Sequence, residues 1–570
     1  MGTEMFERLL GTAKQLGDTH LPPNIPEALS KEVPENATLK DVRNLLVLED
    51  GVDAAAYQNV QDSIAVLWAV YAVLKSDGVF ARDEDGKSGL LLTEIAEAVG
   101  TTMAPVCPII AADEEDTTNY TPLALKGLLG LHILDLITHH QQEPPSTLPT
   151  PALLSLISYT RPADPWTSDA ATAELAQSLL HTHFSRANPA SPSSPRSDFI
   201  ATAVLRDFLR PLFSRSRPPA GVTASGRKAE YVEPERYSGG RRETPDAKPW
   251  KYDRRYAVTV FEWAVENADA PHLSTHWPLY TPVLLSLLDE PPSSLPLKLR
   301  ALRLLRSFWA RLPSNLMRDT GLFPVYEQAV FPTVLCLPSL TPEDESLALL
   351  GAAYPVLFDM AGIIVREGKE DGGEAEVMGQ ETKDRREKNV GDFTDEQRAL
   401  VDRIVREGIM TGYHHAKEHV RLAGFLCEEL RYLVDGIGIL AVKYLKDFLP
   451  MTSEILTDPF GTKHPPSLLA ATHLLQAILR SCWPRIPGRC NEIIRTLMLS
   501  WLNIADDEDD AAFQNNGSPS PADLRAELTK TAQMLSAIMK AAGVDMSERV
   551  GPLIEKEPQL SALFLDPEAA

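Results

Sequence analysis

Cysteine is scarce in this chain of 570 residues. Its 5 cysteines are scattered, and no two form a Cys-x-x-Cys pair. This usage is typical of a reducing compartment and excludes a disulfide framework and a cysteine-based zinc site. The longest uninterrupted apolar run, Ile64–Leu74, is too short to span a bilayer, and the first residues carry no signal-peptide pattern. We therefore expect a cytoplasmic protein, with the nucleus as a second location.

Positive charge is also in short supply. The chain has 55 Lys and Arg against 79 Asp and Glu, a formal net charge of −24. A surface this acidic repels nucleic-acid phosphates and anionic membranes, so we expect neither as a partner. Hydrophobic residues make up 44% of the chain, which is an ordinary share for a globular protein and enough for a core.

The alternating pattern of β-strands is almost absent. Apolar residues recur instead at spacings of three and four, in segments bounded by Pro and Gly. Helix starts are marked by capping sequences such as Thr394-Asp395-Glu396-Gln397 and Ser520-Pro521-Ala522-Asp523. The sequence predicts an all-α protein.

The predicted helices come in pairs, and successive pairs start roughly 45 residues apart where no insertion intervenes, a spacing typical of HEAT-like repeats. Neither helix of a pair can bury its apolar face alone, so such pairs stack. We predict an α-solenoid of HEAT-like helical repeats with flexible insertions. The predicted pairs are 276–289 with 297–312, 322–335 with 342–365, 396–411 with 418–434, and 439–456 with 467–483.

Shifts in composition predict the domain organisation. Stretches rich in Pro, Gly, Ser or charge separate the helical segments and indicate loops or linkers. The predicted parts are an irregular N-terminal helical region (1–150), HEAT-like repeats with a basic flexible loop at 214–249 (151–366), a disordered acidic linker (367–391), C-terminal HEAT-like repeats (392–505), an acidic loop (506–519) and terminal helices (520–570).

One motif suggests zinc chemistry. His415-Ala416-Lys417-Glu418-His419 has the H-x-x-E-H order of one class of zinc peptidases. On a single helix, His415 and His419 would share a face and could bind zinc, with Glu418 as the base. The alternative is that these polar residues begin a solvated helix after Gly408 and Gly412 have ended the preceding one. We expect no zinc hydrolase, no other catalytic activity and no cofactor.

Two other features have ordinary structural interpretations. Gly436-Ile437-Gly438-Ile439-Leu440-Ala441 matches the spacing of a dinucleotide-binding loop, but helical periodicity rather than a strand precedes it, so we predict a turn between helices. Residues 214–255 are basic and contain several aromatic residues. This combination indicates stacking on single-stranded nucleic acid, contact with an acidic protein surface, or a passive loop.

Several motifs resemble a known family. They lie in the predicted repeats, and the resemblance covers roughly residues 160–505. The motifs are His276-Trp277-Pro278-Leu279, Met317-Arg318-Asp319-Thr320-Gly321-Leu322, Thr341-Pro342-Glu343-Asp344-Glu345-Ser346, Asp458-Pro459-Phe460-Gly461 and Cys482-Trp483-Pro484-Arg485-Ile486. Together they resemble the Tel-two-interacting protein two family, the smallest of the three HEAT-repeat subunits of the TTT cochaperone complex.

The resemblance implies a non-enzymatic scaffold. Its main contact would be the large Tel-two-interacting protein one subunit, with the Tel-two subunit as a second partner. The complex would support maturation of phosphatidylinositol-kinase-related kinases (the TOR, ATM and ATR class) and act indirectly with the heat-shock chaperone and the RuvB-like complex. A generic α-solenoid adaptor in another assembly is the alternative.

Four residues are predicted to form a protein-interaction surface. Aromatic and Arg side chains dominate binding energy at most protein interfaces. An Arg that follows a helix end is available to a partner's carboxylates. The predicted interface residues are Phe460, Trp483, Arg485 and Arg489.

Overall fold

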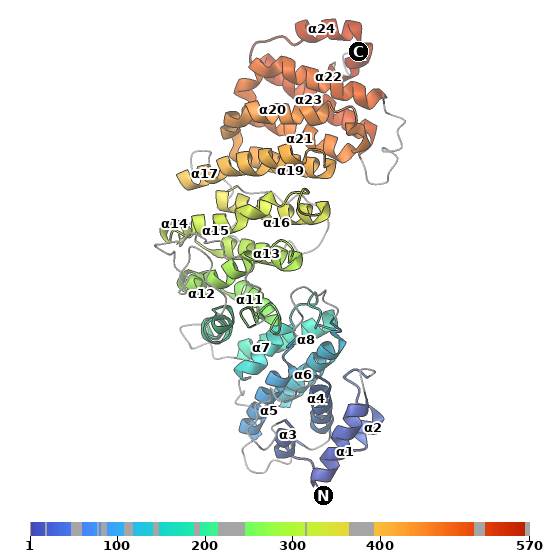
Figure 1. Cartoon of the computed structure of the whole chain (residues 1–570), viewed down its shortest axis with the longest axis vertical. Helices are drawn as coiled ribbons and strands as arrows, with labels where there is room; N and C mark the ends of the chain where they lie inside the picture. Colours follow the sequence, from blue (N-terminus) through green and yellow to red (C-terminus); the bar gives the residue numbers. More distant parts are fainter. Residues whose placement is uncertain are drawn as a thin grey trace. The chain divides into compact units, whose positions relative to one another are not determined.

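The computed structural model describes residues 2–16, 20–46, 60–76, 79–80, 88–107, 118–140, 148–186, 194–214, 246–313, 316–363, 393–506 and 519–564. These residues form helices and connecting turns, without a β-strand among them (Figure 1). The all-α prediction is therefore confirmed. The chain divides into two compact units: unit 1 is Met1–Ser286 with Arg311–Leu316, and unit 2 is Leu287–Ala310 with Met317–Ala570.

In unit 1, helices stack in two layers. Helix α4 packs on α6 and α5 packs on α7, while α5 also contacts α6, so each helical pair covers its neighbour. The helices are α1 (Gly2–Gln15), α2 (Glu27–Ser30), α3 (Leu39–Leu46), α4 (Val60–Lys75), α5 (Ser88–Met103), α6 (Thr121–His140), α7 (Thr150–Ser158), α8 (Ala170–Arg186), α9 (Pro195–Phe199), the π-helical η2 (Ile200–Leu209), α10 (Arg210–Phe213), α11 (Tyr256–Asn267) and α12 (Ala270–Leu288).

Helix α6 is apolar on all sides. Its length and hydropathy would allow it to cross a membrane, but 67% of the qualifying window is buried inside the protein. Its neighbours are α4, α5 and α8. A helix that is hydrophobic all round is typical of the centre of a large core as well as of a membrane span, and α6 packs here as a core helix.

Two glycines allow the helices of unit 1 to approach closely. A Cβ on Gly100 of α5 would lie 2.4 Å from the backbone Cα of Ala152 on α7. A Cβ on Gly127 of α6 would lie 2.2 Å from the ring of Tyr159, which is fully buried. The Tyr159 hydroxyl donates a 2.7 Å hydrogen bond to the carbonyl of Met103 at the end of α5. Tyr159 therefore connects three helices through a space that only glycine leaves open.

The Tyr159 hydrogen bond yields a stability prediction. Tyr159→Phe keeps the ring but leaves the buried Met103 carbonyl without this donor, so we expect a loss of about 1 kcal/mol in the free energy of unfolding. Denaturant unfolding of the full chain measures it. The matched control is Tyr432→Phe, on the partly exposed side of α19 (Val420–Ile437), where the hydroxyl interacts with Arg431 near solvent and we expect a smaller loss. Equal stability of Tyr159→Phe and the unsubstituted chain would contradict the assigned role.

Unit 2 also consists of stacked helices. Helices α19, α21 and α23 lie side by side in one layer, and α20 packs on α22 in the other (Figure 1). This is the two-layered packing of HEAT-like repeats, and it confirms the predicted α-solenoid class. The helices are α13 (Leu295–Arg311), α14 (Leu316–Asp319), α15 (Phe323–Val330), η3 (Phe331–Leu335), α16 (Glu343–Ala361), α17 (Asp395–Arg403), η5 (Ile404–Met410), α18 (Thr411–Ala416), α19, η6 (Gly438–Tyr444), α20 (Leu445–Leu456), η7 (Gly461–Lys463), α21 (Pro465–Cys482), η8 (Trp483–Arg489), α22 (Cys490–Asp506), α23 (Pro521–Ala541), α24 (Ser547–Lys556), η10 (Pro558–Leu560) and α25 (Ser561–Phe564).

Ion pairs connect successive helices of unit 2 at its surface. Each pair joins elements that are distant in sequence but adjacent in the stack. Exposed pairs of this kind contribute little individually, so apolar burial between the layers is the main source of stability. The pairs are Arg403 with Glu327 (2.9 Å), Arg421 with Asp344 (2.8 Å), Lys443 with Asp402 (2.8 Å), Lys417 with Glu454 (2.7 Å) and Arg480 with Asp435 (3.1 Å).

Some predicted segments lie outside the described residues. These are the linker 367–391, residues 215–245 of the predicted basic loop, and residues 507–518 of the predicted acidic loop. The domain boundaries given above therefore stay predictions.

Candidate interaction surface

Phe460 lies on the turn between α20 and α21. The backbone N–H of Phe460 donates to the Asp458 carboxylate at 2.9 Å, and Gly461 begins the short helix η7. This turn presents the Phe460 ring to solvent, with 76% of the residue exposed. A single exposed hydrophobic side chain is common on protein surfaces, so its exposure alone does not identify Phe460 as a binding residue.

Trp483 lies at the other end of α21, on the 3₁₀ helix η8. The residue is 58% exposed. Arg485 and Arg489 are exposed on the same short helix, and Arg489 forms an ion pair with Glu492 at 3.5 Å. Arg485 forms no ion pair or hydrogen bond with any residue in the described part of the chain. Its guanidinium is therefore available to a partner.

The four predicted interface residues fall into two groups. Helix α21 has 18 residues, and a rise of about 1.5 Å per residue makes it about 27 Å long. Phe460 precedes this helix, whereas Trp483, Arg485 and Arg489 follow it. The structure brings the last three together and separates Phe460 from them. A single compact contact centred on all four is therefore excluded, and the interface role of each residue stays a prediction.

Two exposed apolar residues on η6 were missed by the sequence analysis. Ile439 and Leu440 are 42% and 38% exposed on η6, the turn after α19. The C-terminal ends of α19 and α21 are adjacent, because Arg480 pairs with Asp435 and Ser481 Oγ donates to the carbonyl of Val434. Two consecutive apolar residues directly after Gly438 could have indicated an exposed apolar turn. The sequence analysis predicted only a turn between helices there.

Phe460 precedes the opposite, N-terminal end of α21. The N-terminal ends of α19 and α21 are joined by a 2.8 Å hydrogen bond from Ser467 Oγ to the carbonyl of Val420. Arg421 pairs with Asp344 at the start of α16 and is about half exposed. Its guanidinium lies at the surface of the stack. It nevertheless connects neighbouring repeats.

The H-x-x-E-H motif does not lie on one helix. Helix α18 ends at Ala416, residues 417 and 418 form a turn, and His419 is the N-cap of α19 with extended backbone. His415 and His419 therefore lie on opposite sides of a turn, and His419 Nδ1 lies 3.9 Å from Glu343. The shared face that zinc binding requires is absent. The described residues contain no group of three His, Cys, Asp or Glu side chains that could hold a metal ion.

Two of the proposed helix breaks are also wrong. Gly408 lies within the π-helical η5 and Gly412 within α18, and the helical conformation continues from Asp395 to Ala416. A Cβ on Gly408 would lie 3.3 Å from the Tyr354 hydroxyl, so this glycine allows close packing on α16. The glycine therefore serves packing between helices rather than ending one.

The glycine-rich segment at 436–441 forms the predicted turn. Helix α19 ends at Ile437, Gly438 has a positive φ of 54°, and η6 begins there. A helix rather than a strand precedes this turn, so it lacks the context of a dinucleotide-binding loop.

The aromatic residues at the end of the basic segment belong to the core of unit 1. Trp250 and Tyr252 are buried, and Trp250 stacks on Phe213 with ring centroids 4.8 Å apart. Tyr256 is buried and stacks on Phe208. The interpretation of these three residues as a stacking platform for nucleic acid is therefore wrong. Tyr231 and Tyr237 lie outside the described residues.

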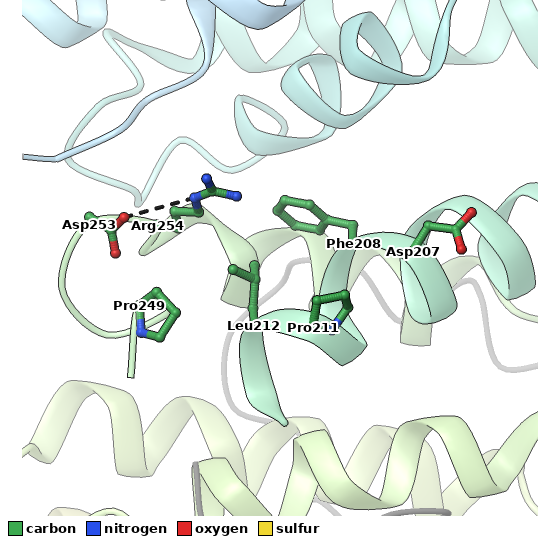
Figure 2. A pocket seen from close by; sticks show the side chains of 7 residues that line it. All are labelled: Asp207, Phe208, Pro211, Leu212, Pro249, Asp253 and Arg254. Atoms are coloured by element: carbon green, nitrogen blue, oxygen red, sulfur yellow. Dashed lines mark ion pairs between the residues drawn. The ribbon is translucent and has the colours of Figure 1, made fainter. Parts of the chain in front are cut away.

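A small pocket lies beside this aromatic cluster (Figure 2). Its volume is about 160 Å³, and the only ion pair drawn in its lining joins Arg254 and Asp253 at 3.9 Å. Ligand pockets for drug-sized molecules are usually several hundred Å³ in volume. This pocket is too small for such a ligand. Its lining residues are Asp207, Phe208, Pro211, Leu212, Pro249, Asp253 and Arg254.

The buried titratable groups are structural. The Cys427 thiol is fully buried, and burial raises its pKa; burial likewise raises the pKa of Cys482 to about 11. Thiols with raised pKa are poor nucleophiles at neutral pH. Burial also raises the pKa of Glu429 to about 8, and the neighbouring Glu428 adds to the effect. The Glu429 carboxyl is therefore largely protonated at neutral pH and fits a packed position on α19.

These features define a class of protein: an all-α helical-repeat protein with exposed aromatic and basic turns. The model of the Tti2 family matches residues 152–463, which is more than half of the chain. The chain belongs to the Tti2 family, as the sequence motifs predicted. The match includes Phe460 and ends before Trp483.

Other comparisons add little to this assignment. None of the curated proteins matches the chain. Among solved structures, yeast importin-β is similar with a TM-score of 0.33 and 12% sequence identity, over 95% of this chain and 58% of importin-β. The match thus spans little more than half of the importin-β chain.

Proposed function

We propose that this protein is a non-enzymatic scaffold subunit of the TTT cochaperone complex and acts in the cytoplasm and the nucleus. Its membership in the Tti2 family carries the proposal. The two-layered helical stack of unit 2 supports it, because such repeats present extended binding surfaces. The proposed partners are the large Tel-two-interacting protein one subunit, the Tel-two subunit and, through the complex, the phosphatidylinositol-kinase-related kinases.

A binding role suits the chemistry of the surface. Aromatic side chains are exposed on turns at both ends of α21, and Arg485 and Arg489 accompany one of them. Aromatic and Arg anchors on rigid turns are typical of protein interfaces. In contrast, the H-x-x-E-H residues that could have supported hydrolysis are divided by a turn. A generic adaptor in another assembly has the same fold and is the second candidate.

Affinity purification tests the proposal. The tagged full-length protein is isolated from native lysate, and its partners are quantified by mass spectrometry. We expect the two larger HEAT-repeat subunits in nearly equal amounts with the bait. Depletion of the protein is expected to lower the abundance of the kinases of the TOR, ATM and ATR class.

The control is the tag expressed alone in the same cells. Recovery of neither subunit, with other proteins enriched in stoichiometric amounts, would contradict the proposal and favour the generic adaptor. If both subunits are recovered but kinase abundance is unchanged after depletion, the protein belongs to the assembly. The role in kinase maturation is then contradicted.

A further inference from the structure

The turns that follow α19 and α21 lie at the same edge of unit 2. The two helices run side by side in the same direction: Ser467 Oγ reaches the carbonyl of Val420 at their N-terminal ends, and Arg480 reaches Asp435 at their C-terminal ends. Residues of η6 also pack on α21, so the segments η6 and η8, which follow these helices, start from the same end of this layer. We define the Trp483 edge as Ile439, Leu440, Arg480, Trp483, Arg485 and Arg489.

The Trp483 edge exposes apolar surface. Ile439, Leu440 and Trp483 are among the few large hydrophobic residues that unit 2 leaves exposed. Isolated exposed hydrophobic residues are common, but a group on adjacent turns is typical of an interaction site. Both turns are 3₁₀ helices, which hold the backbone of these residues in one conformation. Little backbone entropy is therefore lost when their side chains bind.

The same edge is basic in an acidic protein. Its three Arg residues face two carboxylates, Asp435 and Glu492, which leaves a local charge of +1, whereas the whole chain carries −24. Arg480 and Arg489 each have one carboxylate partner, at 3.1 Å and 3.5 Å. Arg485 has no such partner among the described residues. The edge therefore offers guanidinium groups next to an exposed indole.

We propose that the Trp483 edge binds an extended acidic segment of a partner protein. An apolar side chain of that segment packs on Trp483, Ile439 and Leu440, and its carboxylates pair with Arg485 and Arg489. Charge complementarity carries the choice of an acidic occupant, because Arg recognises carboxylates through paired hydrogen bonds. The inference rests on the proposed scaffold function, for which it names a surface and the chemistry of the partner.

Peptide binding to the full-length protein tests the charge requirement. The probe is a fluorescent peptide of about ten residues with leucines at its centre and glutamates on both sides. Its matched partner carries Gln in place of each Glu, and a labelled single-stranded oligonucleotide is the third probe. We expect the Gln peptide to bind about tenfold more weakly than the acidic peptide, and the same loss of acidic-peptide affinity in Arg485→Glu and in Trp483→Ala.

Two variants are controls. Phe460→Ala removes an even more exposed aromatic side chain at the other end of α21, and Arg206→Glu reverses an exposed charge in unit 1. We expect unchanged affinity in both. Equal affinity for the Glu and Gln peptides, or no loss in Arg485→Glu, would overturn the proposal. Tighter binding of the oligonucleotide than of the acidic peptide would replace it with a nucleic-acid site.

Purification of the assembly separates this inference from the proposed function. If the unsubstituted protein recovers the two larger subunits and the double variant Trp483→Ala/Arg485→Glu recovers them equally, the Trp483 edge is not the contact but the scaffold function holds. If the unsubstituted protein recovers neither subunit, the proposed function fails. In that case the peptide measurements still test whether the Trp483 edge binds an acidic segment.

Discussion

Replacing Gly100 with alanine is expected to destabilise the protein by about 3 kcal/mol. In most helices this change stabilises by roughly 1 kcal/mol, because alanine has the higher helix propensity. Here the new Cβ would lie 2.4 Å from both the Cα and the N of Ala152. Backbone atoms cannot rotate away as a flexible side chain can, so α5 and α7 must separate and lose buried contacts along their length.

Gly11→Ala is the matched control. Gly11 lies within α1, and a Cβ at this position would have no other atom within 4 Å. The same substitution is therefore expected to stabilise slightly. Hydrogen exchange of the full chain, followed in peptides from α5 and α7, measures the opening of this part of unit 1. Unchanged protection in Gly100→Ala would contradict the close approach of the two helices.

Glu429→Gln is expected to raise the free energy of unfolding at neutral pH by about 3 kcal/mol. It is also expected to remove part of the pH dependence of that free energy. Burial raises the pKa of this carboxyl from 4.5 to about 8 in the folded state. The folded protein thus keeps a proton that the unfolded chain has released. Stability therefore falls as pH rises from about 4.5 to about 8, and glutamine, which does not titrate, abolishes this fall.

The adjacent Glu428 provides a control of opposite sign. Burial raises its pKa, but the hydrogen bond with His473 and the charge of Arg431 outweigh burial, so the pKa is lowered overall. Glu428 contributes stability above its unfolded pKa that is lost as pH falls through the lower folded value. Glu428→Gln should therefore lower stability at neutral pH. Denaturant unfolding of the three proteins from pH 5 to 8 distinguishes the two carboxyls, and parallel curves for all three would contradict this assignment.

Helices and their pairing could be predicted from the sequence because both depend on local patterns. The segment predicted at 467–483 is α21, observed from Pro465 to Cys482, and the capping box at Thr394 forms as expected, with Gln397 as its partner. Gly408 and Gly412 do not end a helix as predicted, because helix propensity is local and takes no account of neighbours such as Tyr354, which lies close to Gly408. At Gly408, tertiary packing outweighs the local preference.

The candidate surface was only partly predictable for a similar reason. Phe460 and Trp483 are 23 positions apart, and nothing in their spacing tells which ends of which helices become neighbours. Ile439 and Trp483 are farther apart in sequence, yet the stacking of α19 on α21 places their turns at one edge. Burial was equally hidden: Trp250 and Tyr252 stand beside basic residues in the sequence but enter the core of unit 1.

The position of exposed aromatic residues at both ends of α21 has a consequence for assembly. A ligand at the Phe460 turn does not obstruct a ligand at the Trp483 edge, because the length of the helix separates them. Two chains, or two segments of one chain, can therefore occupy this repeat at the same time. When one segment of a bivalent partner is bound, the effective concentration of its second segment at the other turn is high. Two weak contacts can then give slow dissociation of the whole partner. If both turns bind, the length of the helix sets the distance that the two binding segments of such a partner must span.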